Sequence, residues 1–226
     1  MDKLNSGKLL LRAAGVAMLG FGMPLALGLP AAPALAAPGS QAPSRDLDRA
    51  VRALRAIDSM QADFTQVSRG GQRVGGTMTL KRPGKIRFQY ERGVPLLIVS
   101  DGTRLTMLDY EVSQKQVWPV KSSPLGALLD PGKDVTRFGT LVSSSAPDTI
   151  SILVKDPAHP EYGRLTLHFR SKPSAPSGLE LAGWNSVDSQ NNLTRIILNN
   201  HRYGMPISDN MFRYKDVSSP TRRGPR

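Results

Sequence analysis

From about residue 60 onward, apolar and polar positions alternate along the chain in short runs. In residues 85–90, for example, Ile86, Phe88 and Tyr90 alternate with polar side chains. In an extended segment, one face would then be apolar and the other polar and exposed to solvent. A period of two is typical of a half-buried β-strand. The pattern therefore predicts a protein built mainly of antiparallel strands.

Clusters of Gly, Pro, Asn and Asp separate the runs and predict about ten or eleven short strands. Gly75-Gly76 is expected to weaken or bulge the second of them. Short, evenly spaced strands favour a barrel or a strongly curled sheet. The first expected strand runs from Met60 to the Gly70-Gly71 turn, and the second covers 73–81. Further strands are expected in the stretch up to residue 108, described next. The later ones cover 111–120, 149–155, 164–170, 178–187, 193–200 and 211–215.

Two turns divide the stretch from 78 to 108. Arg82-Pro83-Gly84-Lys85 places Pro at a fixed φ beside Gly, which predicts a type II turn. Ser100-Asp101-Gly102-Thr103 is an Asp-Gly pair between apolar runs, a strong signal for a hairpin. We therefore expect three neighbouring antiparallel strands here.

Two segments depart from the strand pattern. Helical spacing predicts an amphipathic helix over about 45–59 with Ser44 as its N-cap. A second helix is expected over 121–130, with Ser123 as N-cap and Pro124 at its first position, and a further helical piece over 133–142. Because these helices are amphipathic, they must lie on the mouth or the inner face of the sheet. Their apolar faces consist of Leu47, Val51, Leu54 and Ile57 in the first, and Leu125, Leu128 and Leu129 in the second.

The N-terminus has the layout of a secretory signal peptide. Basic residues precede an apolar run over 13–29, and Ala34-Leu35-Ala36 resembles a cleavage site. A retained membrane anchor is the alternative, but Pro24, Pro30 and the shortness of the run argue against it. We expect residues 1–36 to be removed on export, leaving a single domain over 37–217 and a basic, disordered tail over 218–226.

The chain has no Cys and a formal net charge of +12. Without Cys there is no disulfide or thiol chemistry, and the fold depends on its core alone. The charge is compatible with binding to nucleic acid, to an anionic membrane surface or to an acidic partner, and equally with a basic face that is only solvated. Export argues against nucleic acid, so no nucleic-acid partner is expected.

The residue patterns that typically carry catalysis are missing. The three histidines are scattered without metal-ligand spacing, and there is no G-x-S-x-G, P-loop or G-x-G-x-x-G after a strand. Asp101 is better explained by its turn than as a catalytic acid. We therefore expect no enzyme, no metal and no cofactor.

An apolar binding site leaves no motif, because its lining repeats the pattern of an ordinary core. The alternation alone does not separate a filled core from a ligand cavity. The candidates for the inner face of the sheet are Phe64, Met78, Leu80, Ile86, Phe88, Leu96, Ile98, Leu105 and Met107.

Five segments together resemble the periplasmic outer-membrane lipoprotein carrier family, LolA. They are QADFTQ (61–66), GTMTLKRPGKIRFQY (76–90), LLIVSDGTRLTMLD (96–109), QVWP (116–119) and SSPLGALL (122–129). The resemblance implies an open antiparallel half-barrel of about eleven strands, covered by the N-terminal helix and the mid-chain helical insertion.

The same resemblance implies a function. Family members take acylated lipoproteins from an inner-membrane lipoprotein-releasing transporter, shield their acyl chains across the periplasm and pass them to an outer-membrane receptor. The chain is then expected to be periplasmic and monomeric. A related half-barrel that senses lipid or lipoprotein and regulates a partner protein is the alternative.

The resemblance also assigns roles to individual residues. The family's functional arginine precedes the Pro of K-R-P, which is Arg82 here, and it bonds carbonyls of the lid in the closed, empty state. The competing interpretation of Arg82 is a solvated cation at a strand end. Ile86 stands where some members have Phe, and Phe88 where some have Trp. The nine inner-face candidates become the lipid-cavity lining, and Leu125, Leu128 and Leu129 become the lid.

Overall fold

The computed structural model describes residues 45–122, 125–130, 134–144, 146 and 148–217. The expected signal peptide, the segment 37–44 with Ser44, the caps Ser123 and Pro124, and the tail 218–226 lie outside these residues. Within the described part, no helix is both long and apolar enough to cross a membrane.

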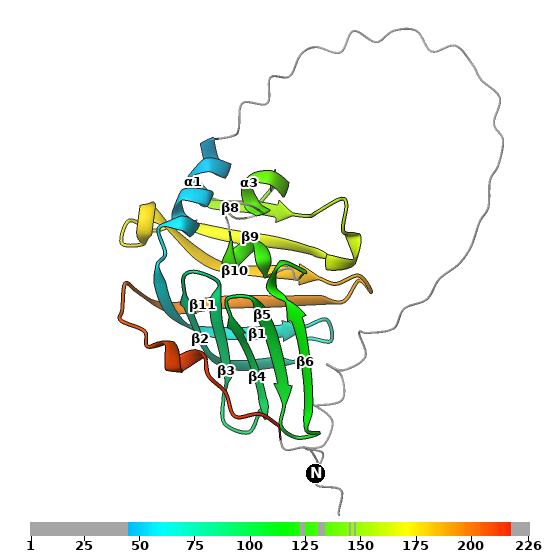
Figure 1. Ribbon diagram of the computed structural model, residues 1–226. Helices are drawn as coiled ribbons and strands as arrows, with labels where there is room; N and C mark the ends of the chain where they lie inside the picture. Colours follow the sequence, from blue (N-terminus) through cyan, green and yellow to red (C-terminus); the bar gives the residue numbers. More distant parts are fainter. Residues whose placement is uncertain (1–44, 123–124, 131–133, 145, 147, 218–226) are drawn as a thin grey trace, which may run out of the picture. The chain divides into compact units, whose positions relative to one another are not determined.

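Eleven antiparallel strands in the described residues form one sheet (Figure 1). Their order is β6-β5-β4-β3-β2-β1-β11-β10-β9-β8-β7, so β6 and β7 are the free edges of an open sheet, as predicted. The pairing of β1 with β11 joins the two halves of the chain. The strands are β1 (Ser59–Ser68), β2 (Arg73–Lys81), β3 (Lys85–Tyr90), β4 (Leu96–Asp101), β5 (Arg104–Asp109), β6 (Gln114–Pro119), β7 (Gly139–Val142), β8 (Thr149–Val154), β9 (Arg164–Ser171), β10 (Leu179–Val187) and β11 (Leu193–Tyr203).

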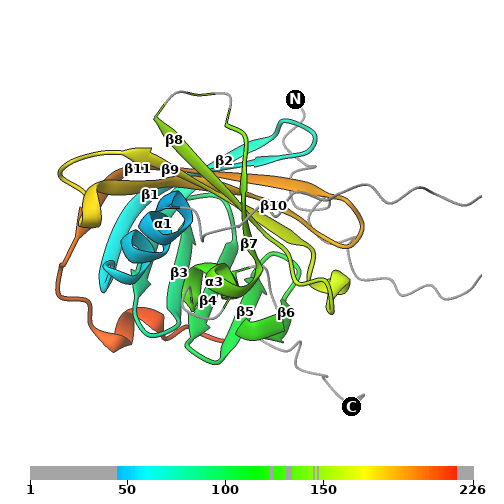
Figure 2. The same ribbon diagram turned by 90° about the horizontal axis from the view of Figure 1, so that it is seen from above.

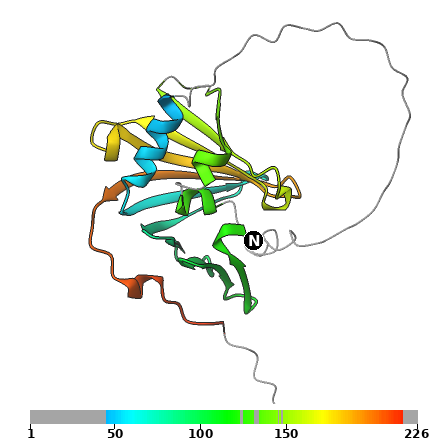
Figure 3. The ribbon, with the colours of Figure 1, turned by 45° about the horizontal axis from the view of Figure 1, so that its top comes forward.

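The sheet curls around its helices, with α1 (Arg45–Arg55) and α3 (Asp134–Phe138) between its two arms (Figure 2). α1 packs against the arm formed by β7, β8 and β10 (Figure 3). The short helix α2 (Gly126–Leu129) follows the 3₁₀ turn η1 (Val120–Ser122) and contacts α3. Three further 3₁₀ turns are η2 (Pro160–Tyr162), η3 (Pro176–Gly178) and η4 (Asp209–Phe212).

The pleat gives the sheet an apolar inner face. Opposed residues share a face, and Met78, Phe88, Ile98 and Met107 form one such row across β2–β5. The helices cover this face, because their buried side chains belong to the same core cluster as those of the strands.

A separate apolar cluster lies on the outer face of β4 and β5. Leu97, Val99 and Leu108 are buried there against Phe212 of η4. Residues 205–217, which we call the C-terminal strap, run along the β3–β4 arm toward the β5–β6 turn (Figure 1). This explains why β4 is apolar on both of its faces.

Three expected elements differ in the structure. The first helix ends at Arg55 instead of 59, because the chain turns there to enter β1. The helical piece expected over 133–142 ends at Phe138, and Gly139–Val142 pairs with β8 instead. The expected strand 211–215 is wrong: the strap pairs with no strand in the described residues, and a 3₁₀ turn places Phe212 on the sheet.

Three local expectations also change. The strand expected from 111 begins at Gln114, because Asp109 Oδ1 accepts hydrogen bonds from two turn amides. Gly75-Gly76 pairs in register, without a bulge. At the first predicted turn Gly84 has the positive φ that type II requires, +70°, but the Arg82–Pro83 peptide bond is cis.

Candidate functional site

All nine predicted lining residues lie on strands β1–β5, and eight of them belong to the main apolar cluster or pack against it. Phe64, Met78, Leu80, Ile86, Phe88 and Leu105 are buried, whereas Leu96 and Ile98 are partly buried. Met107 is partly buried and lies opposite Ile98. The predicted set therefore forms one wall of the inner face.

The opposite wall comes from β8–β11, which the sequence-based list of lining residues missed. Trp184 is 2% exposed, and its ring centroid lies 6.0 Å from that of Phe88, so the two arms meet in an edge-to-face contact. The signal was present in the alternation over 164–170. The buried apolar residues of this wall are Ile152, Val154, Leu165, Leu167, Phe169, Leu179, Leu181, Trp184, Ile196 and Leu198.

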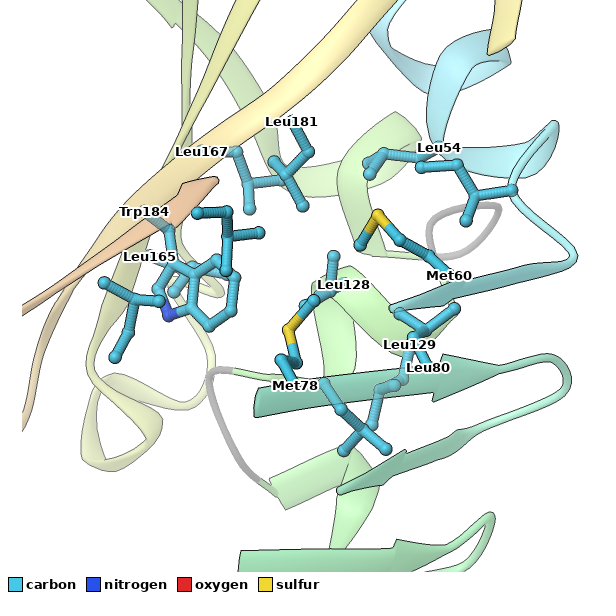
Figure 4. Packing of buried hydrophobic residues seen from close by; sticks show 14 of the residues in the cluster. Leu54, Met60, Met78, Leu80, Leu128, Leu129, Leu165, Leu167, Leu181 and Trp184 are labelled. Atoms are coloured by element: carbon cyan, nitrogen blue, oxygen red, sulfur yellow. The ribbon is translucent and has the colours of Figure 1, made fainter. Parts of the chain in front are cut away.

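Side chains of the helices fill the space between the walls. Leu54 of α1 and Leu128 and Leu129 of α2 are buried in the same cluster as the strands. Figure 4 shows these three directed into the interior that also holds Met78 and Trp184. Leu125 is partly buried and packs against the cluster. All three leucines predicted for the lid thus contact the apolar face.

Arg82 connects both helices to the sheet. Its Nε donates to the carbonyl oxygen of Ile57 at 3.0 Å, and Nη1 donates to that of Leu129 at 2.8 Å. Nη2 donates to the carbonyl oxygens of Leu54 at 2.8 Å and Leu128 at 3.2 Å. One guanidinium therefore satisfies four carbonyls from two segments that are far apart in sequence.

The chemistry of helix ends explains this arrangement. The last carbonyls of a helix have no partner within the helix and carry a partial negative charge. Leu54 lies at the end of α1, and Leu128 and Leu129 lie at the end of α2. A planar guanidinium with five donors can serve several such acceptors at once. Arg82 thus caps two helices simultaneously.

Burial lowers the pKa of Arg82, while the nearby carboxylates of Asp130 and Asp58 oppose that shift. The side chain stays charged, because an arginine guanidinium does not deprotonate in proteins. The backbone amide of Arg82 also donates to the carbonyl of Asp58 at 2.8 Å. These contacts hold the side chain at the junction of α1, β1 and β2.

The two turns singled out in the sequence support each other. Ser100 Oγ donates to the carbonyl of Gly84 at 2.8 Å and accepts from the amide of Gly102 at 3.1 Å. A Cβ atom on Gly84 would lie only 2.8 Å from the Cα atom of Gly102. The turn that carries Arg82 therefore needs glycine at position 84, where it comes closest to the neighbouring turn.

A cavity of about 590 Å³ lies beside Arg82, outside the packed interior. Its lining comes from the two turns, from residues 119–121, from the end of α2 and from Arg55, Arg82 and Asp130. A volume of this size falls within the range of about 300–1,000 Å³ that small-ligand pockets occupy. Arg82 and Leu129, which share a hydrogen bond, both line this cavity.

The histidines stay apart in the fold, and no group of metal-binding side chains occurs in the part of the chain that the structure describes. His159 contacts Glu161, and His168 contacts Ser151. His201 Nε2 lies 2.9 Å from the carbonyl oxygen of Leu181. Burial lowers the pKa of both His168 and His201.

Comparison with known families gives a direct result. The family model described as "Outer membrane lipoprotein carrier protein LolA" matches residues 55–215. The chain belongs to the LolA family. This match spans α2, α3 and every described strand, and it includes Arg82.

Similar proteins carry the same description. The outer-membrane lipoprotein carrier protein of Methylococcus capsulatus is 28% identical over 183 residues, covering 77% of this chain and 86% of the relative. That of Legionella pneumophila strain Paris is 31% identical over 137 residues, covering 57% and 67%. A solved LolA superfamily protein from Nitrosomonas europaea is 11% identical with a TM-score of 0.45, covering 75% of this chain and 96% of that one.

Proposed function

We propose that this LolA-family chain is a periplasmic carrier that encloses the acyl chains of lipoproteins between its curled sheet and its lid. It receives them from an inner-membrane lipoprotein-releasing transporter and hands them to an outer-membrane receptor. The signal-like segment 1–36 directs its export, and the chain works as a monomer without a catalytic step. The observation that carries the proposal is that Arg82 donates hydrogen bonds to four carbonyls and so fixes two helices over an apolar face.

The energy of an exposed acyl chain explains the need for such a protein. Moving an acyl chain of about fifteen methylenes from an apolar environment into water costs on the order of 12 kcal/mol of free energy, at ~0.8 kcal/mol per methylene. A lipoprotein with several chains therefore needs an apolar enclosure to cross an aqueous space. The two walls described above supply an apolar surface on both arms of the sheet.

Release requires a competitor for the cargo. In the empty protein, Leu54, Leu128 and Leu129 occupy the interior, so the closed state recovers apolar burial when the cargo leaves. Arg82 stabilises the same closed state through polar contacts, because its hydrogen bonds form only when both helices are in place. We therefore assign Arg82 the role of a latch that favours release.

The test is a transfer assay with purified protein, donor membranes that contain lipoproteins, and acceptor outer membranes. Arg82→Leu should still collect lipoproteins from the donor and should release them to the acceptor several-fold more slowly. Arg87→Leu is the matched control, because Arg87 also donates to two carbonyls, those of Met211 and Arg213, but on the outer face.

Two outcomes would contradict the proposal. Failure of the unmodified protein to acquire any lipoprotein or lipid from donor membranes, as judged by mass spectrometry, would remove the carrier function. Normal transfer by Arg82→Leu would leave carriage intact and remove the latch. Equal defects in both arginine variants would indicate general loss of stability.

A further inference from the structure

Four aromatic side chains meet at one end of the apolar interior. The ring centroid of Phe64 lies 5.3 Å from that of Phe88 and 5.2 Å from that of Tyr90. Phe88 in turn lies 6.0 Å from Trp184. All three contacts are edge-to-face, a geometry that aromatic pairs favour. We call these four residues the aromatic quartet. Because they come from β1, β3 and β10, they connect the two walls of the sheet.

The quartet and Arg82 lie at opposite ends of the strands. In β2, Gly76 pairs with Tyr90 of β3 on one side and with Phe64 of β1 on the other. Arg82 follows the last residue of the same strand and donates to the carbonyls of the lid. Gly76 and Arg82 are six positions apart in the sequence. At about 3.3 Å per residue, the quartet therefore lies roughly 20 Å along the strand from the residue that anchors the lid.

The sheet holds the quartet in place. A Cβ atom on Gly76 would lie 2.7 Å from Cε1 of Phe64, so the Phe64 ring packs directly against the bare backbone of β2. Tyr90 Oη donates to Oε1 of Gln66 at 2.8 Å, and both of these residues are buried. These contacts leave the rings little freedom to move aside when cargo enters.

The lid end of the interior is filled differently. Leu54, Leu128 and Leu129 are buried there, and they belong to helices that are fixed through Arg82. α2 has only four residues, and a helix that short has little stability of its own. These leucines can therefore leave with the lid, whereas the quartet stays on its strands. The space that opens for cargo then has its mouth at Arg82 and its closed end at the quartet.

From this arrangement we infer that the aromatic quartet is an end-stop that selects the length of the enclosed acyl chain, an inference that rests on the proposed carrier function. The hydrocarbon core of a bilayer is about 30 Å thick, so one acyl chain of a membrane lipid reaches about 15 Å. The space of roughly 20 Å accepts such a chain with its methyl end against the rings. The reverse orientation would bury the polar end of the chain among apolar rings, which is costly.

Trp184 reports contact with the end of the chain directly. The protein has two tryptophans, and Trp118→Phe leaves Trp184 as the only one. Bromine quenches tryptophan fluorescence only at close contact, so its position on a fatty acid shows which part of the acid reaches the quartet. The probes are hexadecanoic acid brominated at its terminal carbon, the same acid brominated next to its carboxyl group, and octanoic acid brominated at its terminal carbon.

The quenching experiment uses protein lacking residues 1–36, because the apolar run in that segment would itself bind fatty acids and the compact unit of the fold is Pro43–Arg226. At saturation, hexadecanoic acid brominated at its terminal carbon should quench Trp184 several-fold more than the isomer brominated next to the carboxyl group. The octanoic acid should quench weakly, because reaching the quartet would draw its carboxylate into the apolar interior.

A series of unbrominated fatty acids of increasing length tests the end-stop itself, through their displacement of the brominated acid. Each added methylene should tighten binding about fourfold until the chain fills the space, after which the affinity should level off. Phe88→Leu removes one ring of the quartet and should move this break to longer chains. Phe169→Leu is the matched control, because Phe169 is also buried but lies outside the quartet, and it should leave the break unchanged.

Two results would overturn the inference: equal quenching by the two brominated hexadecanoic acids, or the same break in affinity for Phe88→Leu and the unmodified protein. Acquisition of lipoproteins from donor membranes is measured on the same preparations. Normal acquisition together with either result would reject only the end-stop and leave the carrier function standing. A protein that acquires no lipoprotein and binds no fatty acid would contradict both.

Discussion

Lys81 and Arg82 are consecutive residues whose charged groups go to opposite sides of the sheet. Lys81 Nζ donates to the carbonyl of Ile207 at 2.8 Å and to Asp209 Oδ1 at 2.7 Å, on the outer face. Arg82 donates to the lid carbonyls at the inner rim. The alternation of a strand thus lets one dipeptide at the end of β2 anchor both the strap and the lid.

Arg82→Lys should loosen the lid while preserving the positive charge. A single ammonium group cannot reach four carbonyls in the geometry that a guanidinium provides. We expect local opening of the lid to become easier by about 2 kcal/mol, the scale of one or two charge-assisted hydrogen bonds.

Hydrogen exchange measures this effect through the amides of Leu128 and Leu129, both of which donate to the carbonyl of Leu125. Arg87→Lys serves as the control and should leave those amides unchanged. Equal protection in Arg82→Lys and the unmodified protein would show that charge alone holds the lid.

Leu128→Ala should weaken the empty state more than the loaded one. Leu128 is 1% exposed in the closed protein, so truncation should lower the free energy of unfolding by about 2–4 kcal/mol. If cargo replaces the Leu128 side chain between the two walls, the truncation lowers the stability of the loaded protein less than that of the empty protein. The apparent affinity for cargo should then rise. Thermal unfolding with and without bound lipoprotein measures the difference, and equal destabilisation of both states would exclude displacement of the lid by cargo.

Acidification should loosen the strap around Asp209. Hydrogen bonds from Lys81 and Lys85 lower the pKa of Asp209 to about 2. Because the folded pKa lies below the unfolded value of about 3.9, the stabilisation is complete above that value and is lost as pH falls toward 2.

Exchange of amides in 205–212 should therefore increase between about pH 4 and pH 2, the interval between the two pKa values. Asp209→Asn should show the same loosening already at neutral pH and much less pH dependence in this segment. A strap with the same pH response in both proteins would point to another carboxylate, such as Asp216, whose pKa is lowered by its hydrogen bond from Lys115.

Gly76→Ala should destabilise the sheet strongly, although Gly76 lies in an ordinary strand. A Cβ atom there would lie 2.2 Å from the carbonyl oxygen of Gln89 and 2.7 Å from Cε1 of Phe64. We expect a loss of at least about 2 kcal/mol, within the range for overpacking.

The matched control for this prediction is Gly70→Ala. There the nearest atom to a new Cβ is Ser68 Oγ at 3.9 Å. Urea unfolding of both variants tests the prediction, and similar midpoints for the two would contradict it.

Local patterns in the sequence already determined most of the sheet. Alternation specified β2 and β3 and most of the later strands, because a half-buried strand must place apolar residues on one side. The lining of the first wall followed from the same rule, and the resemblance to the LolA family added the choice of Arg82 as the latch. Where the pattern was less regular, the prediction was less accurate. The helix predicted over 133–142 ends at Phe138 and is followed by a strand, and the strand predicted over 211–215 was wrong.

Only the tertiary structure decided which distant segments meet. Arg82 and Ile57 are 25 positions apart in the sequence, Arg82 and Leu129 are 47 positions apart, and no local rule links them. The pairing of β1 with β11 brings the second wall opposite the first, so that Trp184 contacts Phe88. The position of the strap on the outer face likewise depends on long-range contacts: its Phe212 packs against β4 and β5, and its Asp209 pairs with Lys81 and Lys85. Periodicity shows which face of a strand is buried, but the partner that buries it is a property of the folded chain.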